Sequence, residues 1–235
     1  MAAARRQMAE EGAASLNMRT VARYVGITPP ALYRYFASRD DLITALIVEA
    51  YEEVADAIEA AVATAPHADY AGRLYQGVVA YREWAVAHPT EFALIYGSPI
   101  PGYHAPDEST GPAAARQGAI FVSILGEAWQ AGVLTLPALP ADMQASLDAQ
   151  MTPWKREHDY DLPGALLYMV LAMWSVMHGM VSLEVFGHAG EILPDPAVFY
   201  RLEIAAQLAR IGLHIVPITY DVTANETERS PAASE

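Results

Sequence analysis

Residues 15–46, SLNMRTVARYVGITPPALYRYFASRDDLITAL, constrain the fold of this chain more than any other stretch. Their capping and helix-ending residues predict two short helices around a tight turn, followed by a longer helix. Asn17 is a good N-cap for the first helix, and Gly26 is a good residue to end it. Thr28 is placed to cap the second helix, and Ser38 the third. This layout is typical of a DNA-reading helix-turn-helix.

The apolar positions predict which faces of these helices are buried. One face of the first helix carries Met18, Val21, Ala22 and Val25. In the second helix, Leu32 and Phe36 share a face, with Ile27 packed beneath. The remaining side chains point outward: Thr28, Pro29, Pro30, Ala31, Tyr33, Arg34 and Tyr35. Tyrosine hydroxyls and arginines suit phosphates, and small or methyl-bearing groups suit base edges, although two tyrosines alone would also fit an ordinary amphipathic surface.

The stretch from Gly12 to Leu46, densest over GITPPALYRYFASRDDL, resembles the DNA-binding domain of TetR-family transcriptional regulators. The resemblance implies that the residues reading or approaching bases are Thr28, Pro29, Pro30, Ala31 and Arg34. It implies that the phosphate-contacting residues are Tyr33, Tyr35 and Arg39, with Arg19 where the preceding helix meets the DNA.

The start of the chain departs from that family, which has a full first helix preceded by a basic arm. This sequence opens at MAAARRQMAEEG, already inside that helix, so we expect the first helix to be cut short. Arg5 and Arg6 on it are candidates for phosphate contact, and a solvated helix face is the alternative.

The distribution of charge agrees with a DNA-binding foot. The formal net charge is −14, but residues 1–45 carry six basic and four acidic side chains, a net of +2, which leaves −16 for the rest. The acidic remainder of the chain repels DNA, so only the basic segment over residues 1–45 should contact it. Binding should weaken as the salt concentration rises.

The shift in charge near residue 45 also suggests the domains. We expect a helix-turn-helix domain over 1–45, a helical effector-binding and dimerisation domain over 46–215, and a disordered tail over 216–235, which lacks apolar periodicity. The absence of cysteine excludes disulfides, thiol catalysis and thiolate metal sites. The polar, amphipathic N-terminus is not a signal peptide, which favours a cytoplasmic protein.

Beyond the helix-turn-helix the pattern is helical, with almost no strand signal, so the fold class is all-α. A long helix from Leu42 to Ala65 would link the two parts, and a Pro/Gly-rich loop runs through Gly111. The other expected helices are 70–88, 89–96, 112–132, 141–150, 164–186 and 196–214.

Residues 162–183, LPGALLYMVLAMWSVMHGMVSL, carry no charge and are long enough to span a bilayer. Ser175, His178 and Gly179 interrupt the segment and no basic flank sets its orientation, so we favour no membrane. A helix that is apolar all round can instead lie between its own domain and a partner subunit. The TetR resemblance implies a homodimer through 164–186 and 196–214.

The body holds a set of aromatic and methionine residues that could line a cavity for a mostly apolar effector. These candidates are Tyr81, Trp84, Phe92, Tyr96, Phe121, Trp129, Met173, Trp174, Met177 and His178. Such residues form a filled core more often than a pocket, and the resemblance is what favours a cavity. The segment from Trp174 to His188 also resembles the tryptophan-histidine-glycine signature of one TetR branch. His178 is either a donor to a polar ligand end or a core histidine with a backbone partner.

An enzyme is the weakest alternative. His158 lies among acidic residues in Lys155–Asp161, but neighbours in a helix point apart and no second histidine lies at ligand spacing, so a solvated loop is favoured over a metal or acid-base site. We therefore predict no cofactor, no metal and no catalysis. The expected function is a homodimeric, effector-responsive repressor bound to a palindromic DNA operator. The rival classes are a membrane-associated helical protein and an interaction protein that does not bind DNA.

Overall fold

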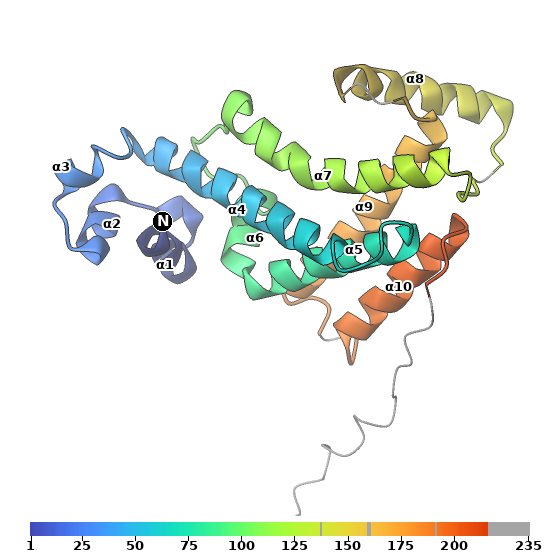
Figure 1. Ribbon diagram of the computed structural model, residues 1–235. Coiled ribbons are helices and arrows are strands. Elements are labelled where there is room, and N and C mark those ends of the chain that lie inside the picture. The colour runs from blue at the N-terminus through green and yellow to red at the C-terminus, as the bar shows by residue number, and fades with distance from the viewer. Residues whose placement is uncertain (137, 159–160, 191, 216–235) are drawn as a thin grey trace, which may run out of the picture.

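The computed structural model describes residues 1–136, 138–158, 161–190 and 192–215, and these residues form helices and loops without a strand (Figure 1). The expected all-α class is confirmed. The expected tail, 216–235, lies outside the described residues. In chain order the helices are α1 (Ala2–Glu11), the 3-10 turn η1 (Ala13–Ser15), α2 (Met18–Val25), α3 (Pro29–Leu32), α4 (Arg39–Val62), α5 (Tyr70–Ala87), α6 (Pro89–Tyr96), α7 (Asp107–Gln130), α8 (Ala141–His158), α9 (Gly164–Val185) and α10 (Pro196–Arg210).

Local hydrogen bonds set the helix ends near the N-terminus. The Asn17 side chain accepts from the Arg19 amide at 2.9 Å, and Ser38 Oγ accepts from the Asp41 amide at 3.0 Å, as expected of N-caps. Gly26 ends α2 with φ of 77°, a conformation that favours glycine. The expected side-chain cap from Thr28 is wrong. The two residues after it are prolines without an N–H, and the next amide already bonds to the Thr28 carbonyl at 2.9 Å.

Helices α1 to α3 and the first turns of α4 enclose one small core, and we call this unit the reader. Its buried residues include Ala4, Met8, Leu16, Met18, Val21, Ala22, Leu32, Leu42, Ile43, Leu46 and Ile47. Val25 was expected on the buried face but is 53% exposed, because α2 ends there beyond the edge of the core. The first helix, expected to be cut short, forms ten residues and contributes two side chains to this core.

Helix α4 runs unbroken from the reader into the rest of the molecule, which we call the body. A second core begins at Ala50 and is built from α4, α5, α6, α7, α9 and α10. Helix α4 spans Arg39–Val62 rather than Leu42–Ala65, and α10 ends at Arg210 rather than 214. Helices α7 and α8 differ more from expectation. Helix α7 starts at Asp107 rather than 112, because Asp107 and Glu108 suit a helix N-terminus and Pro112 is tolerated inside it. Helix α8 continues through Pro153 to His158 instead of ending at 150.

The uncharged segment forms α9, which is long and apolar enough to cross a bilayer, with mean hydropathy of 1.7 and 22% of its most apolar window buried within the chain. The exposed apolar side chains of α9 and α10 are Tyr168, Leu171, Trp174, Val176, Leu183, Phe199 and Leu202. Leu171 and Trp174 also line a cavity in the body. The others, on α9 and α10, are the apolar face that a single chain leaves uncovered.

Candidate nucleic-acid interface and effector cavity

Helix α3 lies at the tip of the reader, at the end of the molecule remote from α8, α9 and α10 (Figure 1). Most of the residues expected to meet DNA are exposed there: Arg19, Thr28, Pro30, Tyr33, Arg34 and Tyr35, with Pro29 and Ala31 half-buried. Tyr33 is 49% exposed and Tyr35 is 78% exposed, which is unusual for aromatic side chains without a partner surface. The tip thus presents arginine, hydroxyl and methyl groups together.

The second helix of the pair is shorter than was expected from a helical face shared by Leu32 and Phe36. Its α-helical part is Pro29–Leu32, and residues 33–35 continue as a tightened turn. In that turn the Arg34 amide bonds to the Ala31 carbonyl at 3.3 Å and the Tyr35 amide to the Leu32 carbonyl at 2.9 Å. The turn keeps Leu32 buried while Tyr33 and Tyr35 face outward.

Arg39, expected at a phosphate, is engaged inside the reader. Its Nε donates to the Leu16 carbonyl at 2.8 Å and its Nη2 to the Ala14 carbonyl at 2.9 Å. A guanidinium in this position ties the start of α4 to the segment that joins α1 and α2. In the structure, Arg39 therefore stabilises the packing of α4 against the segment that joins α1 and α2. We call this its bracing role, and it does not depend on contact with phosphate.

Replacing Arg39 by methionine is expected to lower the free energy of unfolding by about 1–3 kcal/mol, because two backbone carbonyls lose a charged donor. Arg34→Met, at an exposed position on the tip, removes the same charge and should leave stability unchanged. Urea unfolding followed by circular dichroism measures both. Equal stability of the two variants would contradict the bracing role.

The two arginines of α1 differ sharply. Arg5 faces three carboxylates of α4 and α6, and its side chain is 20% exposed. Glu53 and Glu49 raise its pKa, so neither phosphate contact nor a solvated face holds for it. Arg6 is 66% exposed and pairs with Glu10 Oε1 at 2.9 Å. The other oxygen of Glu10 accepts a hydrogen bond from Tyr24 Oη at 2.7 Å. Arg6 therefore remains available near the reader surface.

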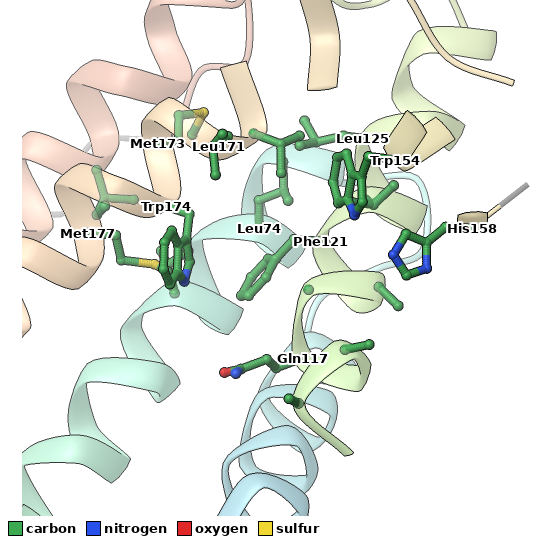
Figure 2. A pocket seen from close by; sticks show the side chains of 18 of the residues that line it. Leu74, Gln117, Phe121, Leu125, Trp154, His158, Leu171, Met173, Trp174 and Met177 are labelled. Atoms are coloured by element: carbon green, nitrogen blue, oxygen red, sulfur yellow. The ribbon is translucent and has the colours of Figure 1, made fainter. Parts of the chain in front are cut away.

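The body contains a cavity of about 320 Å³ bounded by α4, α5, α6, α7, α8, α9 and α10. Its wall is apolar and aromatic, with small side chains along α7 (Figure 2). In Figure 2, Trp154 and His158 of α8 lie on one side and Trp174 and Met177 of α9 on the other, with Phe121 between them. Such a wall suits a small, largely apolar ligand.

Five of the ten residues expected to bind an effector line this cavity: Tyr96, Phe121, Met173, Trp174 and Met177. The other five do not. Tyr81, Trp84 and Phe92 are 1%, 6% and 0% exposed and are packed within the body core. Trp129 is 36% exposed near the end of α7, and His178 stacks on Trp174, whose side chain lines the cavity. These five side chains are therefore not part of the cavity wall in this structure.

The cavity also includes residues that the sequence interpretation did not select. Tyr51 and Gln117 lie on the wall, and Gln117 donates to the Tyr96 hydroxyl. Trp154 and His158 were missed because the helix was expected to end at residue 150, whereas α8 continues to His158. A signal was present, since Met151, Trp154 and His158 recur at helical spacing.

His178 sits in an aromatic cage. Its Nδ1 is 2.8 Å from Tyr81 Oη and its Nε2 is 3.3 Å from Ser182 Oγ. Its ring stacks on Trp174 at 5.1 Å and on Phe92 at 5.6 Å between centroids. Burial among these rings lowers the pKa of His178. Of its two expected roles the core histidine fits, although its partners are hydroxyls and not a backbone carbonyl.

The lowered pKa of His178 predicts a loss of stability on acidification. As the pH falls through the ordinary value of 6.5, the unfolded chain takes up a proton that the folded chain resists, so the free energy of unfolding decreases with a slope below ~1.4 kcal/mol per pH unit. His178→Gln should flatten this dependence, whereas His104→Gln, at an exposed position, should not. Urea titrations at about pH 7.5 and pH 5.5 measure it. Identical slopes in the two variants would contradict the assignment.

Within the described residues, no cluster of three or more histidine, aspartate or glutamate side chains is arranged to hold a metal ion. His158 and its acidic neighbour Glu157 end α8, where His158 turns to the cavity. The solvated loop expected over 155–161 is therefore wrong for residues 155–158, which are helical, and residues 159 and 160 lie outside the described residues.

Comparison with known proteins covers both parts of the chain. Residues 1–46 match the family described as bacterial regulatory proteins, tetR family, and residues 74–207 match the family described as tetracyclin repressor-like, C-terminal domain. The chain is similar to the HTH-type transcriptional regulator Rv1816 of Mycobacterium tuberculosis, with 34% identity over 213 residues that cover 89% of each chain.

Solved structures show the same likeness. The regulatory protein SCO4313 is 36% identical with a TM-score of 0.70, covering 88% of this chain and 91% of that chain. A protein of unknown function from Rhodococcus sp. RHA1 is 21% identical with a TM-score of 0.67, covering 90% and 92%, and shares the fold.

Proposed function

Because this chain belongs to the TetR family of bacterial transcriptional regulators, we propose that it is a homodimeric repressor that leaves a palindromic operator when a small, mostly apolar effector occupies the body cavity. As a family member the chain is a DNA-binding transcriptional regulator and not an enzyme. The observation that carries the proposal is the pairing of an exposed basic tip on the reader with an apolar cavity in the body.

On the DNA side, residues 28–35 enter the major groove. Thr28, Pro29, Pro30, Ala31 and Arg34 approach base edges, and Tyr33, Tyr35 and Arg19 hold phosphates. The exposure of Tyr33, Tyr35 and Arg34 at the tip supports these roles. We place the boundary between reader and body domains at residues 45 and 46, within α4.

The exposed apolar face of α9 and α10 is the dimer interface in this proposal. Leu183 and Leu202 are 52% and 51% exposed, and a second copy would bury them. This occupant explains the apolar character of α9 in a DNA-bound regulator better than a bilayer does, because the reader has to reach DNA. We place the protein in the cytoplasm, where its operator is.

The effector is expected to be small and uncharged over most of its surface. The wall offers the hydroxyls of Tyr51 and Tyr96, the amide of Gln117 and the imidazole of His158, and the rest is aromatic or aliphatic. Burial raises the pKa of Tyr51 and Tyr96, so both hydroxyls stay neutral. A charged ligand would lose its hydration without a counter-charge from these residues.

A gel shift on the DNA that flanks this protein's own gene tests the proposal. We expect a discrete complex that weakens as salt rises, because contacts with phosphate release counterions, and the few basic contacts set the slope. The complex should dissociate when a suitable apolar metabolite is added. A scrambled duplex of the same composition is the control. Equal binding to both duplexes, or no complex at low salt, would contradict the DNA-binding role.

A further inference from the structure

Helix α6 is shared between the cavity and the reader. Tyr96 at its end lines the cavity, whereas the adjacent Leu94 and Ile95 pack against the reader core. Beyond the helix, Ile100 is a buried member of that same core. Because closely packed side chains transmit displacements, a shift of α6 acts on the cavity and on the reader at once.

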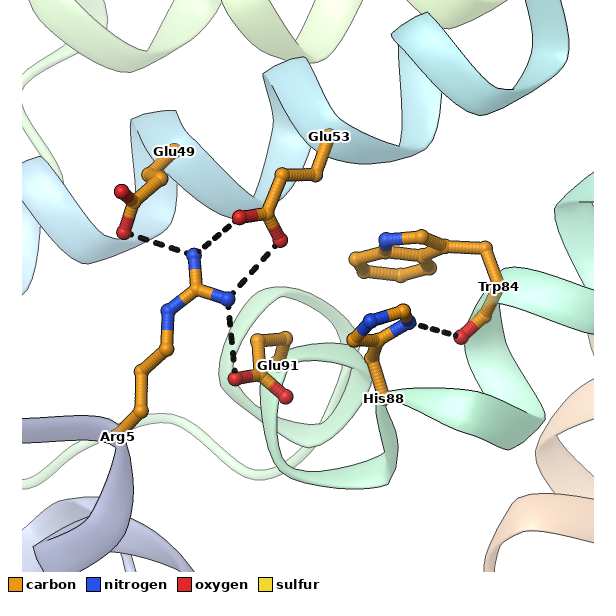
Figure 3. A network of polar contacts seen from close by, with 6 residues as sticks. All are labelled: Arg5, Glu49, Glu53, Trp84, His88 and Glu91. Carbon is orange, nitrogen blue, oxygen red and sulfur yellow. Dashed lines mark hydrogen bonds and ion pairs between the residues drawn. The ribbon is translucent and has the colours of Figure 1, made fainter. Parts of the chain in front are cut away.

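Arg5 is the polar tie between α6 and the reader (Figure 3). Its Nη2 lies 2.7 Å from Glu49 Oε2 and 2.6 Å from Glu53 Oε1, both on α4, and its Nη1 lies 3.3 Å from Glu91 Oε1 on α6. The Glu91 side chain is 11% exposed, so solvent and salt screen this pair less than a surface pair. One guanidinium thus joins α1, α4 and α6.

The cavity wall and the partners of Arg5 interleave along α4. Tyr51 lies between Glu49 and Glu53 in sequence and lines the cavity. Its ring meets the Tyr96 ring edge-on with centroids 6.0 Å apart, and its hydroxyl reaches the Ile95 carbonyl at 3.5 Å. A ligand that presses on Tyr51 or Tyr96 therefore acts on the helices that carry the carboxylates of Arg5.

A second arginine holds α4 from the cavity side. Arg116 of α7 lies between the cavity residues Ala115 and Gln117. It pairs with Glu52, with Asp56 at 2.7 Å and with Glu59 at 2.6 Å, all on α4. The α7 wall is therefore tied to α4 from Glu52 onward, so α1 and α6, which Arg5 joins, are the elements left to shift against α4.

We propose that Arg5 is the positioning residue that transmits occupancy of the cavity to the reader, through its ion pair with Glu91. An effector seated against Tyr51 and Tyr96 displaces α6, Glu91 moves away from Arg5, and α1 turns together with the reader. The two readers of a dimer then no longer match the operator. This inference rests on the proposed function, because it assigns the route by which that cavity controls DNA binding.

The chain contains no cysteine, so an introduced one can be labelled selectively and the label can stand in for an effector. Gly118 lines the cavity, and a Cβ added there meets no atom within 4 Å. Full-length Gly118→Cys is reacted with N-phenylmaleimide. Its affinity for the operator duplex identified by the gel shift is measured by fluorescence anisotropy before and after labelling. We expect labelling to lower affinity about ten-fold or more.

The same label is then tested without the Glu91 carboxylate. In Gly118→Cys with Glu91→Gln, labelling should lower affinity less than about two-fold, and Arg5→Lys should blunt the response similarly because an ammonium cannot fork across three carboxylates. Glu83→Gln, on the exposed side of α5, should keep the full response. Labelled Gly111→Cys, on α7 outside the cavity wall, is the control for attachment.

An equal loss of affinity on labelling with and without the Glu91 carboxylate would overturn the role of Arg5. No effect of the label when Glu91 is intact would overturn it as well. If instead every unlabelled variant failed to distinguish the operator from a scrambled duplex while remaining folded by circular dichroism, the proposed function itself would fail.

Discussion

Replacing Leu202 by arginine is expected to leave the protein monomeric and to weaken operator binding by about 100-fold or more. Leu202 is 51% exposed on α10, in the apolar face shared with α9. A second copy seated there would bury the new guanidinium without a counter-charge, which is strongly unfavourable. A monomer holds one reader against one half-site and loses the gain in effective concentration that the second reader provides.

Light scattering gives the mass of the variant, and anisotropy gives its affinity for the operator. Leu183→Arg on α9 should behave like Leu202→Arg, because both side chains belong to the exposed face. Met143→Arg is the matched control, since Met143 is 49% exposed on α8. This variant should remain dimeric and bind the operator with unchanged affinity. A Leu202→Arg protein that stays dimeric would place the interface elsewhere.

Replacing Ala31 by serine is expected to change which base pair is preferred at one position of each half-site, by about 1–3 kcal/mol. Ala31 is half-buried on α3, and the proposal places its methyl group at a base edge. Thr28, one turn earlier and exposed, should show the same kind of effect with Thr28→Val. The preference changes because hydrogen-bonding groups at base edges differ between base pairs.

Tyr33→Phe should act differently, with a uniform loss of affinity for all duplexes, because it removes one hydroxyl donor to a phosphate. Anisotropy titrations against a panel of duplexes with symmetrical single base-pair changes separate the two behaviours. Val25→Thr, at an exposed position that ends α2 and is not among the proposed DNA contacts, is the control. Equal losses from Ala31→Ser and Tyr33→Phe on every duplex would contradict the division into base and phosphate contacts.

Much of the reader could be predicted from the sequence because its determinants are local. Asn17, Ser38 and Gly26 set helix ends through bonds within a few residues. The Thr28 cap failed for a local reason as well, since the prolines after it supply no amide. The contacts of Arg5 and Arg39 could not be predicted, because their partners lie in distant parts of the sequence. Arg39 bonds to carbonyls of the segment that joins α1 and α2, and Glu91 lies 86 residues from Arg5.

The cavity shows the same limit more strongly. Tyr81, Phe92 and Tyr96 are all aromatic residues on neighbouring helices, yet of the three only Tyr96 lines the cavity. Which aromatic residue meets a cavity depends on how α5, α6 and α9 are rotated against one another, and periodicity alone does not fix that rotation. Trp154 lies beyond residue 150, where the helix was expected to end, whereas α8 continues through Pro153.

The central claim is that two copies of residues 28–35 read the major groove of one operator. Dimethyl sulfate probing of the complex tests it directly, because the reagent attacks guanine N7 in the major groove and adenine N3 in the minor groove. We expect two protected patches of guanine N7, separated by about one helical turn, roughly 10 base pairs, or a multiple of it, with adenine N3 unprotected between them. Protection of adenine N3 alone, or of a single patch by the dimer, would contradict it.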